Sequence, residues 1–157
     1  MNDKTKSLNT VIWQIRRLFQ RLACESNELL SQFDISASHR AVLEILSNVE
    51  PETVPNMAKN YDASRQHVQK IVNELATKGL VETHENPSHK RSVLVVRTNK
   101  GKKLLEKIKK MEEKIYLHMM QHLDETSLQQ TGETLSVFNM FMHSQTWQTI
   151  KSEHLRT

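Results

Sequence analysis

The stretch VPNMAKNYDASRQHVQKIVNELATKGLVETHENPSHKRSVLVVR, residues 54–97, decides how this chain folds. Its centre, at about residues 64–78, is predicted to be a helix, because four aliphatic side chains recur there at the spacing of one helical face. Ser64 is the expected N-cap, and Gly79 is where the helix should stop. A shorter helix is expected before it, joined by a tight turn at residues 60–63. The four aliphatic residues are Val68, Ile71, Val72 and Leu75.

Two runs typical of β-strands follow this helix, at residues 80–85 and 92–97, and they flank a polar, basic loop. The order helix, turn, helix, hairpin is that of a winged helix-turn-helix. A helix with one buried face and Arg, Gln and Lys on the other can lie in a major groove, where these side chains contact base edges or only phosphates. The candidate residues of this recognition helix are Ser64, Arg65, Gln66, His67, Gln69 and Lys70.

The composition fits a small, mostly helical DNA-binding protein. The chain has 157 residues with only 3 Gly and 3 Pro, and its net charge is +4. Residues 54–103 contain ten basic and four acidic residues, so the positive charge is concentrated on the stretch that would face a phosphate backbone. No apolar run is long enough for a membrane span, and the N-terminus lacks the apolar core of a signal peptide, so a cytoplasmic location is expected.

Long amphipathic helices are predicted on both sides of this stretch, at about residues 5–33 and 100–150. Their apolar stripes exceed what one small winged domain can bury, so they are interpreted as dimerisation helices. A helix at residues 36–48 with Ser36 as N-cap lies between, followed by a polar loop at 48–53. The last helix should begin at Asp124 or Thr126. Thus the whole chain is expected to form one domain, with the winged core at about residues 35–100.

These segments together resemble the MarR family of bacterial winged-helix transcription factors. The resemblance covers roughly residues 10–145, and it rests on ordered pieces: residues 35–43, Met57 to Ser64, Val68 to Leu75, Lys78-Gly79-Leu80-Val81, residues 86–92 and Thr98-Asn99-Lys100-Gly101. It implies a homodimer with intertwined terminal helices and recognition helices in successive major grooves. It also implies wings that touch the flanking minor grooves.

The resemblance also points to the wing residues His89, Lys90 and Arg91. Arg91 matches the arginine that reaches the minor groove in this family. The family usually has Asp before two Arg, and here His89 replaces the Asp that would brace the arginine. At the turn, Tyr61-Asp62-Ala63 replaces a commoner Leu-Gly-Val type; Asp62 is expected to adopt the left-handed conformation, which Asp tolerates better than most residues.

Several other residues have alternative interpretations. Ser38 and Arg40, at the start of the 36–48 helix, are candidate phosphate contacts. Cys24 is either an inert thiol or a redox sensor, and as the only cysteine it has no internal disulfide partner. His118 and His122 are one helical turn apart, but a pair without further ligands indicates a helix seam more than a metal site.

The predicted fold is therefore mostly α with a small β-hairpin wing. The predicted function is a homodimeric, sequence-specific regulator of double-stranded DNA, most simply a repressor of a pseudo-palindromic operator. A small-molecule effector would bind between the long helices and the winged unit, near Leu18, Leu22 and Met111. The alternatives are a winged-helix protein–protein adapter and a regulator that senses oxidants through Cys24. No enzyme, cofactor or metal site is predicted, because no catalytic motif is present.

Overall fold

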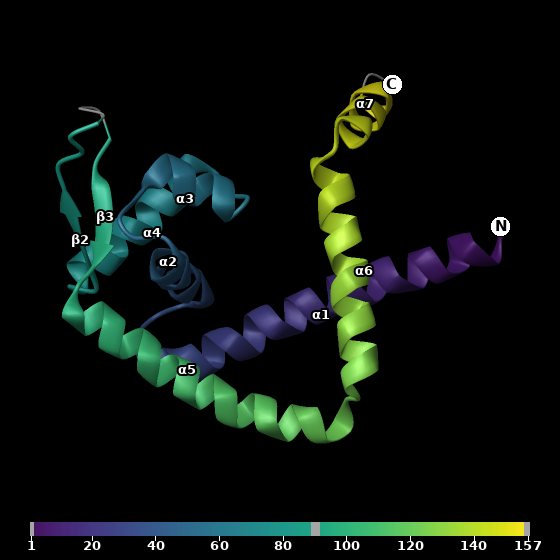
Figure 1. Ribbon diagram of the computed structural model, residues 1–157, viewed down its shortest axis with the longest axis horizontal. Helices are drawn as coiled ribbons and strands as arrows, with labels where there is room; N and C mark the ends of the chain where they lie inside the picture. Colours follow the sequence, from purple (N-terminus) through teal and green to yellow (C-terminus); the bar gives the residue numbers. More distant parts are fainter. Residues whose placement is uncertain (1, 89–91, 156–157) are drawn as a thin grey trace. The chain divides into compact units, whose positions relative to one another are not determined.

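A computed structural model describes residues 2–88 and 92–155 of the chain (Figure 1). Within these residues the protein is mostly helical, with one small antiparallel sheet, as the sequence predicted. The elements are α1 (Asp3–Ser31), α2 (Ala37–Asn48), β1 (Glu52–Thr53), α3 (Val54–Asn60), α4 (Arg65–Thr77), β2 (Val81–His84), β3 (Leu94–Arg97), α5 (Asn99–Met119), the short 3₁₀ turn η1 (Met120–His122), α6 (Glu125–His143) and α7 (Gln145–His154).

The chain divides into two compact units, residues 1–110 and 111–157. The first, called the winged unit below, contains α1 to β3 and the beginning of α5. The second contains the end of α5 with α6 and α7, and Phe141 contacts Trp147 there with ring centroids 5.8 Å apart. That both units belong to one domain remains a prediction.

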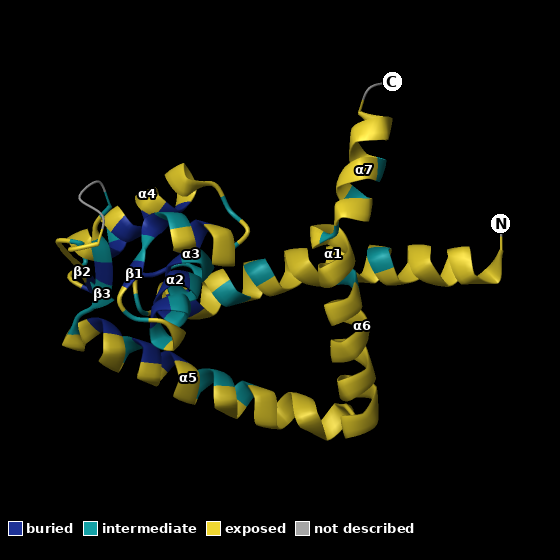
Figure 2. Cartoon of the chain, turned by 45° about the horizontal axis from the view of Figure 1, so that its top comes forward, coloured by how far each residue is buried: buried dark blue, intermediate teal, exposed yellow. Residues whose placement is uncertain are grey.

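Among the described residues, the buried core lies in the winged unit, where α2, α3, α4, the sheet and the beginning of α5 contribute to it (Figure 2). The predicted apolar face of α4 is buried, and α2 and the start of α5 add to the same cluster. From α1 only Leu30 is buried among the described residues, near the end of that helix. The fully buried side chains with the largest volumes are Leu30, Leu43, Leu46, Met57, Leu75, Ile108, Val42, Val68, Val72 and Val95.

The helix boundaries follow the expected caps. The hydroxyls of Ser36, Thr53 and Ser64 accept hydrogen bonds from the backbone N–H three residues later, and so begin α2, α3 and α4. Gly79 follows the end of α4 with φ +67°, a left-handed conformation that ends helices. Asp62 has φ +50° in the turn before α4, which confirms the expected left-handed residue there.

The sheet contains one strand that the sequence did not predict. Its order is β1-β3-β2, both pairs are antiparallel, and Glu52 lies opposite Val95. Residues 48–53 were interpreted as a polar loop, which is wrong for Glu52 and Thr53. These two residues extend the hairpin sheet because β3 has a second edge free to pair with them.

The long helices end differently from the prediction. Asp124 is the N-cap of α6 and its carboxylate accepts from the Ser127 amide at 2.9 Å, so the first of the two proposed starts is confirmed. The helical region does not continue unbroken to residue 150, because Ser144 is extended and begins the separate helix α7. None of the described helices is both long and apolar enough to cross a membrane.

Glu50, in the segment after α2, forms hydrogen bonds with Arg97 at the end of β3. Its carboxylate accepts hydrogen bonds from the Arg97 amide at 2.5 Å and the Arg97 guanidinium at 3.1 Å, and the Lys102 ammonium lies 3.8 Å away. Burial raises the pKa of Glu50, but the hydrogen bonds and charges of Arg97 and Lys102 outweigh it and hold the pKa below its ordinary value. Such a carboxyl stabilises the fold above its unfolded pKa, and that stabilisation disappears as pH falls through the folded pKa.

Glu50→Gln should therefore lower the free energy of unfolding by about 1–3 kcal/mol at neutral pH, the usual contribution of hydrogen bonds to a charged group. The difference between variant and wild type should shrink in acid, below the ordinary glutamate pKa of 4.5. Urea unfolding of both proteins at neutral and acidic pH measures this. A difference that stays constant across the two conditions would contradict the role of the ionised carboxylate.

Candidate nucleic-acid interface

The exposed face of α4 presents the predicted recognition residues together. Because Val68, Ile71 and Val72 fix the opposite face in the core, the polar side chains between them must point outward. All six predicted residues are exposed: Ser64, Arg65, Gln66, His67, Gln69 and Lys70. Their exposure fits the predicted surface for contacts in a major groove.

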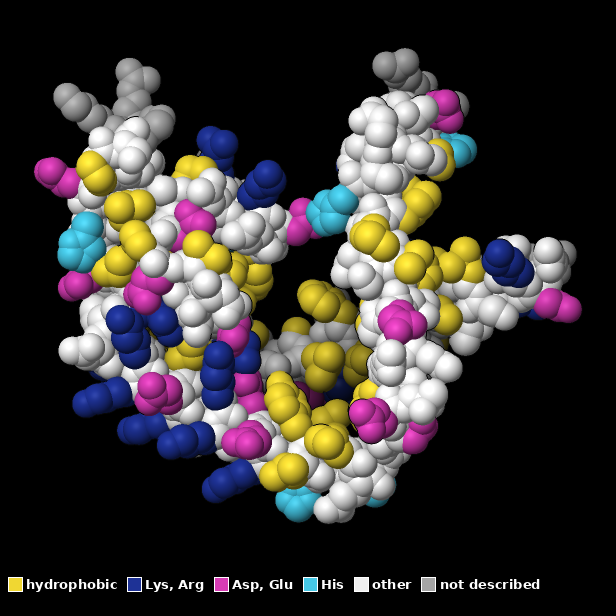
Figure 3. Space-filling view, in the orientation of Figure 1, with side chains coloured by type: hydrophobic (Ala, Val, Ile, Leu, Met, Phe, Trp, Pro, Cys, Tyr) yellow, Lys and Arg dark blue, Asp and Glu magenta, His cyan; other side chains and the backbone are white. Residues whose placement is uncertain are grey.

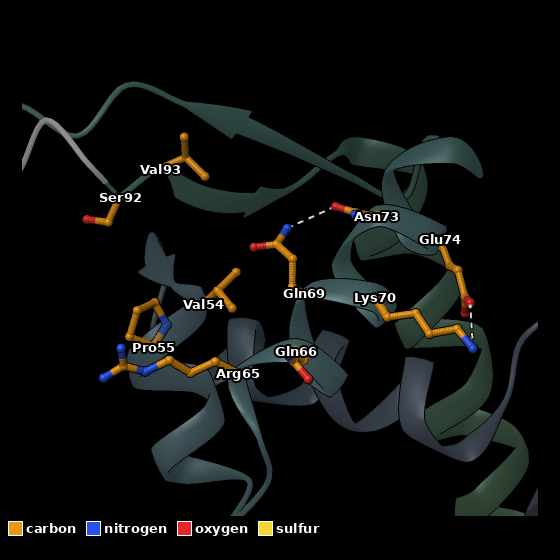
Figure 4. A pocket seen from close by; sticks show the side chains of 10 residues that line it. All are labelled: Val54, Pro55, Arg65, Gln66, Gln69, Lys70, Asn73, Glu74, Ser92 and Val93. Atoms are coloured by element: carbon orange, nitrogen blue, oxygen red, sulfur yellow. Dashed lines mark hydrogen bonds and ion pairs between the residues drawn. The ribbon is translucent and has the colours of Figure 1, made fainter.

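The side chains of these six residues have different partners, and Figure 4 shows four of them: Arg65, Gln66, Gln69 and Lys70. The Gln69 amide donates to Asn73 Oδ1 at 2.9 Å, and the Lys70 ammonium lies 3.9 Å from Glu74 Oε1. Within the described part of the chain, no carboxylate forms an ion pair with Arg65. Ser64 is occupied as the N-cap, since its hydroxyl accepts from the His67 amide at 3.2 Å. Arg65 is consequently the cation on this face that is most available to an external anion or base edge.

A groove of about 660 Å³ runs beside this face, between α4, the start of α3 and the residues before β3. Arg65, Gln66 and Lys70 line it from α4, while Pro55 belongs to α3. Ser92 and Val93 line the other side and come directly before β3. The groove therefore joins the recognition helix to the base of the wing, the two elements that contact DNA in winged helix-turn-helix proteins.

The wing residues His89, Lys90 and Arg91 lie outside the described residues. The strands that carry the wing are described, and the Asn86 amide donates to Ser92 Oγ at 3.1 Å across its base. The pairing of β2 with β3, with His84 opposite Leu94, confirms the predicted hairpin.

The start of α2 contains a contact that was not predicted from the sequence. His39 Nδ1 accepts from the Ser36 amide at 3.0 Å, so His39 takes the place that Glu or Gln has in a capping box. On its other side, His39 Nε2 lies 2.9 Å from Glu74 Oε2 on α4. This nearly buried imidazole joins the beginning of α2 to the recognition helix. The signal in the sequence was Ser36 followed three residues later by a side chain that can accept a hydrogen bond.

The candidate phosphate contacts Ser38 and Arg40 lie in the first turns of α2 and are half-buried. The Arg40 guanidinium lies 3.4 Å from the Glu44 carboxylate, one turn later on α2. Because α2 packs against α4, both residues belong to the same unit as the recognition face. Their contact with phosphate remains a prediction.

Comparison with known proteins agrees with this geometry. Residues 35–101 match the sequence model of a family described as a winged helix DNA-binding domain. Uncharacterized proteins of Mycobacterium tuberculosis and Mycobacterium bovis are each 27% identical to the chain over 135 residues, which is 86% of this chain and 92% of theirs.

Solved structures give the same fold over more of the chain. A MarR family transcription regulator has a TM-score of 0.80 at 22% identity, covering 88% of this chain and 92% of that one. A DNA complex of MepR from S. aureus has a TM-score of 0.76 at 19% identity, and the match covers 83% of this chain and 96% of that one. A mutant MarR from E. coli complexed with operator DNA has a TM-score of 0.76 at 22% identity, and the match covers 87% of this chain and 99% of that one. The chain has the MarR fold.

The solved structure with this fold and a TM-score of 0.80 is a MarR family transcription regulator, and residues 35–101 match a winged helix DNA-binding domain. Two other predicted candidates, Cys24 and the pair His118 and His122, lie outside the recognition face. Cys24 is exposed on α1. His118 lies on α5, whereas His122 lies in the 3₁₀ turn after it, so the two do not share one α-helix as predicted. Among the described residues, no group of three or more His, Cys, Asp or Glu side chains is arranged to hold a metal ion.

Proposed function

We propose that this protein is a homodimeric repressor that binds a pseudo-palindromic operator in double-stranded DNA. The observation that carries the proposal is the exposed, polar and basic face of α4 on a chain with the MarR fold. Arg65, Gln66, Gln69 and Lys70 would contact base edges, while His67 would contact phosphate. The wing residue Arg91 would add a minor-groove contact, as the resemblance implies. A protein that binds an operator in this way would be located in the cytoplasm.

The apolar surface of the long helices supports a second copy as the partner. On α1, Trp13, Leu18 and Phe19 are 55%, 57% and 68% exposed, which is unusual for side chains of this size. On α6, Val137 and Met140 are exposed as well, and apolar side chains follow both helices in Figure 3. Apolar surface of this extent marks an interaction site. A two-fold dimer would cover it and present two recognition helices to two half-sites.

A small-molecule effector would release the operator by changing the distance between the two recognition helices, since a packed dimer interface has discrete arrangements. Leu18 and Leu22 are exposed in the single chain, so their place in an effector site would depend on the dimer. The exposed thiol of Cys24 favours oxidation as the alternative signal. A Cys24→Ser variant separates the two, because only oxidant sensing requires the thiol.

Selection of random duplex DNA on the purified protein tests the proposal. We expect a two-fold symmetric consensus whose half-sites are about one helical turn apart. Titration of that consensus and of random DNA at two salt concentrations should show that the specific affinity survives salt better. Sedimentation should give a dimer. Binding without sequence preference that disappears with salt would contradict the operator proposal and favour a protein adapter.

A further inference from the structure

The winged unit has a second hollow, separate from the groove beside the exposed face of α4. Its volume is about 840 Å³, and three segments form its walls: the corner after α1, the end of α4, and the beginning of α5. Four lysines line it: Lys78, Lys100, Lys103 and Lys107. Asp34 is the only acidic residue among its lining residues, so the hollow has an excess of three positive charges.

Two of these lysines are already fixed by the fold. The Lys78 ammonium donates a hydrogen bond to Asp34 Oδ2 at 2.5 Å, and this contact lowers the pKa of the Asp34 carboxyl. The positive charge of Lys78 is therefore compensated by Asp34. The Lys100 ammonium donates to the Lys78 carbonyl oxygen at 2.7 Å. A carbonyl oxygen does not neutralise a charge, so Lys100 remains a preorganised cation at the wall of the hollow.

Lys103 and Lys107 complete the cluster. They are one helical turn apart on α5 and exposed, and no described carboxylate forms an ion pair with either of them. By contrast, Lys102 and Lys109 on other sides of α5 lie near Glu50 and Glu44. The basic side chains along α5 are visible in Figure 3. Of the four lysines that line the hollow, only Lys78 is therefore paired with a carboxylate among the described residues.

The position of the cluster opposes helix stability. The first turn of α5 contains Lys100, Lys102 and Lys103 and no acidic residue. Cations are unfavourable at this end of a helix, because the backbone amides already make it positive. The same amides favour an anion. Residues that lower the stability of their own helix often have a function, and these lysines line a hollow. Their position therefore favours the binding of an external anion.

Three of the lining residues are apolar, and they are called the apolar floor of the hollow below. Phe33 and Leu104 are half-buried and pack against the core, and Leu80 is almost completely buried. Fully solvated inorganic anions gain nothing from such a surface, whereas an organic body does. The shape and the charge together favour a small molecule, because DNA needs an extended surface and not a recess with an apolar floor.

We propose that this hollow binds a small organic phosphate, with the phosphate on Lys100, Lys103 and Lys107 and its apolar body on Phe33 and Leu104. The excess of three charges favours a phosphate dianion over a monocarboxylate. Lysine binds phosphate as a point charge and needs no bidentate geometry. The binding requires no operator, and so it is independent of the proposed repressor activity.

Isothermal titration of the full chain with phenyl phosphate, inorganic phosphate and benzoate tests this site. We expect phenyl phosphate to bind once per chain and at least about tenfold more tightly than either other probe, because only phenyl phosphate combines a dianion with an aromatic body. Equal affinity for benzoate would overturn the phosphate assignment. Equal affinity for inorganic phosphate would overturn the role of the apolar floor.

Two matched double variants locate the site. Lys103→Ala/Lys107→Ala should weaken the binding of phenyl phosphate at least about tenfold, since it removes two of the three lysines proposed to hold the phosphate. Lys110→Ala/Lys114→Ala removes the same charge from the same helix outside the hollow and should change the affinity less than about twofold. Circular dichroism checks that both fold. Equal losses in both variants, or displacement of phenyl phosphate by random duplex DNA, would mean a general polyanion surface and overturn the proposal.

Discussion

Arg65→Ala should weaken operator binding about tenfold to hundredfold, because one good arginine–base pair contributes roughly 1–3 kcal/mol. Arg65 is the first residue of α4, its side chain points outward, and it has no ion-pair partner among the described residues. The substitution leaves the buried face of α4 intact. Thermal stability should therefore stay close to that of the wild type, and the loss should be one of binding alone.

Fluorescence anisotropy with the selected operator and a scrambled duplex, over a range of salt, measures this effect. If Arg65 reads a base, affinity falls for the operator and little for the scrambled duplex. If it contacts only phosphate, both affinities fall alike and the salt slope decreases by about one. Lys114→Ala, which removes one charge from the second compact unit, is the control. An unchanged operator affinity would remove Arg65 from the interface.

The recognition face could be predicted because its signals are local. The aliphatic spacing in α4 specifies which side is buried, and the caps at Ser64 and Gly79 specify where the helix begins and ends. The outward direction of Arg65 and Gln69 follows from these alone. Their exposure is therefore confirmed, while the contacts they would make with bases remain predictions.

Features that depend on distant segments could not be predicted in the same way. β1 has only two residues and no alternating pattern, and it is a strand because Glu52 lies opposite Val95 in the folded chain. The contact of His39 with Glu74 joins two helices and leaves only a weak local signal. Ser144 shows the opposite difficulty: a serine can continue a helix or cap a new one, and here its hydroxyl accepts from the Trp147 amide at 3.2 Å.

The beginning of α5 depends on a glycine for a reason that periodicity does not reveal. A side chain at Gly101 would overlap the carbonyl oxygen of Leu80, and its Cβ would come within 3.0 Å of the carbonyl carbon. That carbonyl cannot easily turn away, because its oxygen accepts from the Thr98 amide at 3.1 Å. The Thr98 hydroxyl in turn caps Gly101 and donates to the Gly79 carbonyl. The close approach thus fixes α5 against the end of α4.

Gly101→Ala should lower the free energy of unfolding by about 3 kcal/mol or more, since a backbone clash cannot be relieved by a side-chain rotation. For a chain of this size the melting temperature should fall by roughly 6–12 °C. The matched control is Gly132→Ala on α6, where a new Cβ meets nothing within 4 Å. There alanine should stabilise by about 0.5–1 kcal/mol through helix propensity. Calorimetry on the two variants measures the expected loss of stability in Gly101→Ala and the expected gain in Gly132→Ala. A Gly101→Ala protein as stable as the wild type would contradict the close packing of α5 against Leu80.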